Sequence, residues 1–169
     1  GLKVQYRVEN KGELTLPYGI ALHPYFNFLG PRESAYLCVP ARAHMEAVNL
    51  MPTGKLESLE GMPYDITSPT PVAELVLDDV YWGMRPGQPA RIEYRQTGIR
   101  VELAASAEFT HMVVYIQPQN NFFCVENQTC STDAHNLHAA GLVEESHLLF
   151  AAPGETSGGW IHYRLSRIP

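Results

Sequence analysis

The sequence is short of charged residues, and basic residues are the scarcer kind. Only 18% of its 169 residues are charged, and 12 Lys and Arg stand against 18 Asp and Glu, which gives a net charge of −6. Nucleic acids and anionic membranes are bound through a basic face, so we expect neither as a partner. The same charge disfavours a heavily phosphorylated substrate and leaves a neutral small molecule, such as a sugar, as the better candidate.

Long apolar runs and a signal peptide are also missing. No stretch approaches the roughly 20 apolar residues of a membrane-spanning helix. The three cysteines, Cys38, Cys124 and Cys130, are odd in number and form no disulfide framework. We therefore expect reduced thiols and a cytoplasmic protein. Cys38 and Cys124 have apolar neighbours, which is typical of cysteines that pack in a core.

Metal and cofactor motifs are absent from the sequence as well. The seven histidines are scattered, and His135 and His138, three residues apart, have no carboxylate or cysteine at ligand spacing. The sequence contains no glycine-rich phosphate loop and no serine flanked by glycines in the manner of a nucleophile elbow. We expect neither a metal nor a cofactor.

The pattern that is present is that of β-strands. Residues 2–9 alternate apolar and polar, residues 10–13 supply a turn, and residues 14–22 read as the returning strand of a hairpin. The 13 Gly and 13 Pro lie mostly between further strand-like stretches. These are residues 35–40, 91–93, 99–104, 112–116, 122–126, 147–152 and 157–166. The sequence therefore predicts one all-β domain over residues 1–169, an antiparallel β-sandwich with almost no helix.

Two segments depart from this rhythm. Residues 133–141 could form a short helix that is capped by Ser131 or Thr132 and ends at Gly141. Residues 45–70 have little periodicity and are expected to form a long loop, of the kind that is often functional.

Two other segments carry the residues suited to chemistry. Residues 122–129 read as a buried strand with the carboxylate of Glu126 near its end, and burying an unpaired charge is costly. His23 lies among aromatic residues, where an imidazole can give or take a proton near neutral pH. Either residue could instead be structural, Glu126 by capping a turn or through an ion pair with an arginine such as Arg95 or Arg100. Together they supply an acid and a base for a neutral polar substrate.

The same segments resemble a known family. The run His23–Asn27 resembles the histidine motif of aldose 1-epimerases, the galactose mutarotases. The run Cys124–Thr129, followed by residues 132–136, resembles the glutamate motif of that family, and Leu77–Tyr81 falls where the family carries a sugar-binding aspartate. The resemblance covers nearly all of this chain but only the later half of a family member, which implies a galactose mutarotase-like sandwich that is incomplete here.

The resemblance implies an isomerase that interconverts the α and β anomers of a hexose such as galactose or glucose. His23 would protonate the ring oxygen, and Glu126 would take the proton of the anomeric hydroxyl. Asp78 would bind sugar hydroxyls, with Asp79 as a solvated or capping neighbour. Members of the family commonly carry Asn before the histidine, where this chain has Leu22.

Other side chains are candidates for contact with the sugar. Tyr25, Trp82 and Tyr115 could stack on a pyranose or simply pack in the sheet. Gln117 could donate a hydrogen bond to a hydroxyl.

Alternatives to the enzyme stay open at this point. A carbohydrate-binding or regulatory module could keep the fold without turnover. A hexose-6-phosphate epimerase would need a basic cluster, for which Arg85, Arg91, Arg95 and Arg100 are candidates. The family's preceding half, with an Arg and a further His, matches nothing here. It could lie outside this chain, in another piece of a nicked protein, or be replaced by a homodimer.

Overall fold

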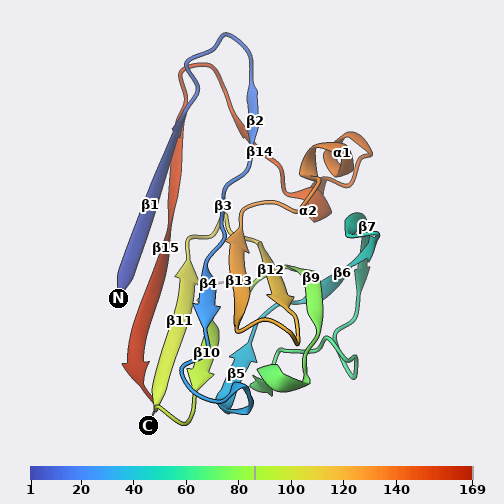
Figure 1. Ribbon diagram of the computed structural model, residues 1–169. Coiled ribbons are helices and arrows are strands. Elements are labelled where there is room, and N and C mark those ends of the chain that lie inside the picture. The colour runs from blue at the N-terminus through green and yellow to red at the C-terminus, as the bar shows by residue number, and fades with distance from the viewer. Residues whose placement is uncertain (86, 169) are drawn as a thin grey trace.

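The computed structural model describes residues 1–85 and 87–168, and two antiparallel sheets face each other in it (Figure 1). The six-stranded sheet contains, in spatial order, β1 (Leu2–Glu9), β15 (Thr156–Arg167), β11 (Ile99–Ala105), β10 (Ala90–Tyr94), β5 (Ala35–Cys38) and β8 (Thr70–Pro71). The seven-stranded sheet runs from β3 (Ala21–Leu22) and β4 (Tyr25–Asn27) through β13 (Phe122–Gln128), β12 (His111–Ile116), β9 (Leu77–Trp82) and β6 (Ala43–Val48) to β7 (Met51–Glu57). The predicted antiparallel sandwich is confirmed.

Helix is scarce, as the sequence predicts. In the part of the chain that the structure describes, the α-helices are α1 (Ala134–Ala139) and α2 (Val143–Ser146). Two single 3₁₀ turns, η1 (Arg32–Ser34) and η2 (Val72–Glu74), lie earlier in the chain. No helix among these residues is long and apolar enough to cross a membrane.

The hairpin predicted for residues 2–9 and 14–22 is wrong. β1 pairs with β15, at the other end of the chain, and β2 (Leu16–Tyr18) pairs with β14 (Leu149–Ala151). In Figure 1 the first and last strands accordingly lie side by side. Alternation indicates that a segment is a strand, but it does not identify the strand's partner.

The expected long loop is also wrong in part. β6 and β7 form a hairpin within residues 43–57, with a register shift between Met45 and Ala47. That irregularity disturbs the alternation on which the sequence prediction depends.

The short helix is present, but its N-cap is Asp133, in the left-handed conformation and without a side-chain capping bond, rather than Ser131 or Thr132. Gly141, with φ of +87°, follows its C-cap as predicted.

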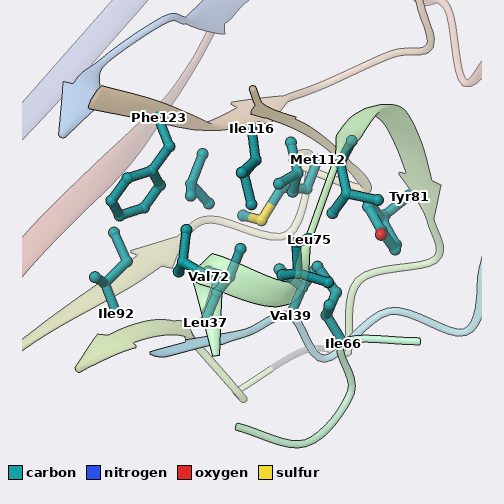
Figure 2. Packing of buried hydrophobic residues seen from close by; sticks show 14 of the residues in the cluster. Leu37, Val39, Ile66, Val72, Leu75, Tyr81, Ile92, Met112, Ile116 and Phe123 are labelled. Carbon is teal, nitrogen blue, oxygen red and sulfur yellow. The ribbon is translucent and has the colours of Figure 1, made fainter. Parts of the chain in front are cut away.

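The main core fills the space between the two sheets. Figure 2 shows Phe123 and Ile116 of the seven-stranded sheet pointing toward Ile92 and Leu37 of the six-stranded sheet. All four are fully buried. Complete burial of such side chains stabilises a fold by about 1.5–3 kcal/mol each.

The outer face of the seven-stranded sheet is partly covered by the two helices. Leu137 of α1 packs on Met45 and Val80 in a second, smaller apolar cluster. His111, at the start of β12, is fully buried under α2, where its Nε2 donates to the carbonyl of Glu145 at 2.9 Å and its Nδ1 contacts the Thr110 hydroxyl. The helices therefore leave the β3, β4 and β13 end of this face open.

A buried ionic cluster lies at the edge of the main core. His44 on β6 contacts Asp79 through Nε2 at 2.7 Å and Glu57 through Nδ1 at 3.4 Å, the latter an ion-pair contact rather than a well-aligned hydrogen bond. Its ring stacks on Tyr64 at 4.1 Å between centroids. Burial alone would lower the pKa of His44, but Asp79 and then Glu57 raise it above its ordinary value.

The His44 cluster predicts a loss of stability at alkaline pH. Because its pKa is raised on folding, protonated His44 contributes stability that is fully present below the unfolded value of about 6.5 and is lost as pH rises through the folded value. We expect His44→Gln to cost roughly 1.5–3 kcal/mol at pH 6, as for hydrogen bonds to charged groups. Urea unfolding of both proteins from pH 6 to 9 should show this deficit narrowing, and a constant deficit would contradict the prediction.

His111 predicts a loss of stability in acid, opposite in direction to the effect of His44. Burial lowers its pKa to about 4, so between about pH 6.5 and 4 the unfolded chain takes up a proton that the folded chain refuses. Over that range this residue alone removes about 3 kcal/mol of stability, at about 1.36 kcal/mol per pH unit. His111→Gln should flatten the acid slope by this amount in urea unfolding carried out from about pH 4 to 6.5. His44→Gln is the comparison variant, because the pKa of His44 is raised and its own titration lies above this range.

Candidate functional site

The open part of the outer face is organised by the pairing of β13 with β3 and β4. Asn127 lies opposite Leu22, and Cys124 lies opposite Tyr25, so both ladders have the same offset. His23, in the gap between β3 and β4, therefore falls opposite Glu126. Residues that face each other across an antiparallel pair share one face of the sheet, so this register brings the two side chains together.

Proline explains why the strand is interrupted at His23. Pro24 has no N–H to donate to a ladder, and it favours an extended conformation in the residue before it. Exposure alternates from residue 21 to 28, with the odd-numbered residues exposed and the even-numbered ones half-buried. His23 is thus held extended on the outer face, while Leu22 is turned away from it toward the core.

The distance between the two predicted catalytic residues is short. His23 Nε2 lies 3.7 Å from Glu126 Oε2, and the side chains are 51% and 7% exposed. Within residues 1–85 and 87–168, His23 is the only basic side chain at ion-pair distance from Glu126. A carboxylate and an imidazole at this distance can act together as an acid–base pair.

Two further side chains border the His23 ring. Cys124, fully buried, places its Sγ 3.3 Å from Nδ1. Tyr25 lies against the ring at 4.8 Å between centroids and is itself contacted edge-on by Phe122 at 4.9 Å. The imidazole is therefore contacted at each ring nitrogen and on its side, which restricts its orientation.

The two neighbouring aspartates lie on different faces of the sheet. Asp78 is opposite Tyr115, which is opposite Cys124, so Asp78 shares the outer face with Glu126. It lies two strands across and two residues along the sheet from Glu126, or about 12 Å between the backbones. Burial and then Asp79 raise the pKa of Asp78. Asp79 faces the core, where it pairs with His44 and accepts the Asp78 N–H at 3.0 Å. Of the two roles that the sequence suggested for Asp79, solvated or capping, the solvated one is wrong. Of the pair only Asp78 is available on the outer face.

The other predicted contact residues are spread along the same face. Tyr25 is 59% exposed, beside His23. Tyr115 is half-buried and its hydroxyl accepts from Asn120. Gln117 follows the end of β12, and its amide donates to the Leu77 carbonyl at 3.4 Å. Trp82 is under α2, donating to the Glu144 carbonyl, which removes it from the open part of the face.

Glu126 forms no ion pair with Arg95 or Arg100, the arginines that the sequence offered as its partners. Arg95 and Arg100 both pair with Glu93 on the six-stranded sheet, at 3.4 and 2.9 Å. Arg91 lies on the same sheet, opposite Cys38. None of these three strand arginines contacts Glu126, so they supply no basic cluster for a phosphate at this face.

The His23, Cys124 and Glu126 ligand atoms lie within 4.8 Å of one another, a spacing that could hold a metal ion. The sulfur, however, approaches Nδ1 while the carboxylate approaches Nε2. A metal ion binds one imidazole nitrogen, so it would not use both contacts. Burial, followed by the Glu126 charge, raises the pKa of the Cys124 thiol to about 12, which opposes the thiolate that metals bind. The arrangement is better suited to moving protons.

Sequence reasoning assigned Cys124 to core packing and missed its contact with His23. The signal was in the spacing. Cys124 and Glu126 are two apart in a strand, so they share a face, and a residue that lies opposite one of them is a diagonal neighbour of the other.

Comparison with known proteins identifies the family and the fold. The family model described as Aldose 1-epimerase matches residues 1–164. A galactose mutarotase-like protein from Clostridium acetobutylicum has a TM-score of 0.86 at 18% identity, over 99% of this chain and 53% of that one. Galactose 1-epimerase from Lactobacillus acidophilus NCFM has a TM-score of 0.73 at 14% identity, over 99% and 54%. The aldose epimerase homologue from C. elegans has a TM-score of 0.74 at 16% identity, over 99% and 57%.

These structures show the fold, and the chain spans about half the length of each of them. The family match is independent of them and extends over almost the entire chain. The resemblance inferred from the histidine and glutamate motifs is confirmed, and the chain belongs to the aldose 1-epimerase family.

Proposed function

We propose that the site interconverts the α and β anomers of a hexose, with Glu126 as general base and His23 as general acid. The observation that carries the proposal is the 3.7 Å approach of His23 Nε2 to Glu126 Oε2. In a pyranose the anomeric hydroxyl O1 and the ring oxygen O5 are bonded to the same carbon, C1. An acid and a base this close can therefore each reach one of the two oxygens of a single sugar.

The reaction begins with Glu126 ionised and the His23 ring protonated on both nitrogens. Glu126 takes the O1 proton while Nε2 gives its proton to O5, the C1–O5 bond breaks, and C1 becomes an aldehyde. Rotation about C1–C2 presents either face of the aldehyde to the O5 hydroxyl. On closure O5 attacks C1 and returns its proton to Nε2, and Glu126 returns its proton to O1. Atoms and charge balance, and both residues end as they began.

Asp78 is assigned to binding rather than to the chemical step. Its carboxylate is on the same face, two strands from the base and three from the acid, on the side suited to hydroxyls at the far end of the ring. The exposed ring of Tyr25 offers an apolar surface beside His23 on which a pyranose can stack.

Glu126→Gln tests the base. The amide keeps the shape of the side chain and can still contact O1, but it cannot take the proton. We expect kcat to fall by roughly two to four orders of magnitude, the usual contribution of a positioned acid or base. Polarimetry on freshly dissolved α-D-glucose or α-D-galactose measures the rate, for this chain and for any longer form of the protein that contains it.

Glu102→Gln is the matched control, since Glu102 is a half-buried glutamate on β11 of the other sheet. Equal rates for Glu126→Gln and the parent, with sugar binding intact, would show that Glu126 is structural. A parent that binds sugar without turnover would instead identify a non-catalytic carbohydrate-binding module.

Asp78→Ala separates binding from chemistry. If Asp78 holds hydroxyls equally in the ground and transition states, KM should rise several-fold or more while kcat changes little. The same polarimetric assay over a range of sugar concentrations gives both constants. Glu74→Ala, an exposed acidic residue in η2, serves as the control. A fall in kcat at unchanged KM would contradict the assignment.

A further inference from the structure

The contact between Cys124 and His23 is not used by the proton transfers described above. Cys124 Sγ lies 3.3 Å from His23 Nδ1, on the ring nitrogen away from Glu126. We propose that Cys124 is a positioning residue whose sulfur accepts the Nδ1–H of His23, so that Nε2 alone exchanges a proton with the substrate. This inference deepens the proposed function and rests on it.

The chemistry of the acid sets the direction of this hydrogen bond. After Nε2 gives its proton to O5, the neutral ring must keep its remaining proton on Nδ1, so that Nε2 has a free lone pair for the return step. A ring that began neutral with its proton on Nε2 would have to become an imidazolate to act as the acid, which is unfavourable near neutral pH. An acceptor at Nδ1 is therefore needed, and sulfur can accept a hydrogen bond, although weakly.

The neutral state of the thiol suits this role. Burial and the Glu126 charge raise the pKa of Cys124 to about 12, so its sulfur is an uncharged thiol at neutral pH. A carboxylate at Nδ1 would fix the same tautomer but would also stabilise the imidazolium strongly and oppose release of its proton. A neutral sulfur orients the ring without that opposition.

Other roles for Cys124 agree less well with its surroundings. A nucleophile must reach the substrate as a thiolate, whereas this side chain is fully buried and protonated. A side chain that only filled space would need no polar atom directed at Nδ1. The register also places Cys124 opposite Tyr25, the residue that packs against the same ring, so both contacts come from one cross-strand pair.

The tautomer of His23 is measured directly by nitrogen-15 NMR of the labelled chain at a pH where the imidazole is neutral. Its signals are assigned by their loss in His23→Asn. We expect Nδ1 protonated and Nε2 unprotonated in the wild type. This is the reverse of the preference of free imidazole side chains in water and of the tautomer that the Glu126 carboxylate beside Nε2 would favour by itself. Cys124→Ala should shift the population toward Nε2–H, and Cys124→Ser, whose hydroxyl can accept, should retain Nδ1–H.

Cys38→Ala is the matched control, because Cys38 is a buried thiol on the other sheet that contacts the Thr67 carbonyl. It should leave the His23 signals unchanged. A wild type with its proton on Nε2 would mean that the thiol donates instead, and it overturns the proposal without any variant having to fold. An Nδ1–H tautomer that persists in Cys124→Ala would overturn it as well.

Kinetics supply the second readout. Loss of one neutral hydrogen bond predicts a fall in kcat of about two- to ten-fold in Cys124→Ala, with little change in KM and recovery in Cys124→Ser. The NMR measurement and the kinetic measurement test different claims. The predicted tautomer in a protein without mutarotation would refute the proposed function alone, whereas mutarotation with the wrong tautomer would refute only the role of Cys124.

Discussion

The site depends on one constraint, the register in which β13 pairs with the interrupted strand formed by β3 and β4. The common offset of its two ladders sets His23 opposite Glu126 and Tyr25 opposite Cys124. A slip of one residue would turn His23 to the core face and expose Phe26, which packs on Phe123. Packing of the apolar side chains in the core therefore fixes the register of this strand pair. The register in turn fixes the positions of the polar side chains on the outer face.

The two faces also explain how a buried carboxylate is tolerated. Glu126 lies beside half-exposed His23 rather than among the apolar side chains on the reverse of β13. Its charge has an opposite charge beside it when the imidazole is protonated. Asp79 shows the alternative arrangement, in which a carboxylate at the edge of the core is held by His44. Glu126 and His23 are therefore placed where they could exchange protons with a substrate, whereas Asp79 and His44 are held in a pair with each other.

Much of the fold and the central pair of the site could be predicted from the sequence, because strand alternation is local and the motifs around His23 and Glu126 are short. What could not be predicted is pairing. The opening segment alternates as a hairpin would, yet β1 pairs with a strand about 150 residues away, and only the packing of the complete chain selects that partner. The β6–β7 hairpin was missed because its register shift breaks the alternation. The spacing of Cys124 and Glu126 places both on one face, but the contact of Cys124 with His23 also depends on the non-local pairing of β13 with the β3–β4 segment.

Chemistry and recognition are distributed differently over this chain. The proposed acid, base and positioning thiol come from one strand pair, β13 with the β3–β4 segment, so their relative geometry requires only that this pair and its packing be intact. Asp78 is two strands away and depends on β12 lying in register between them. Distances within a pair are fixed by backbone hydrogen bonds, whereas distances across several strands also depend on sheet twist. Changes that bend the sheet should therefore affect how the sugar is held before they affect how its proton is moved.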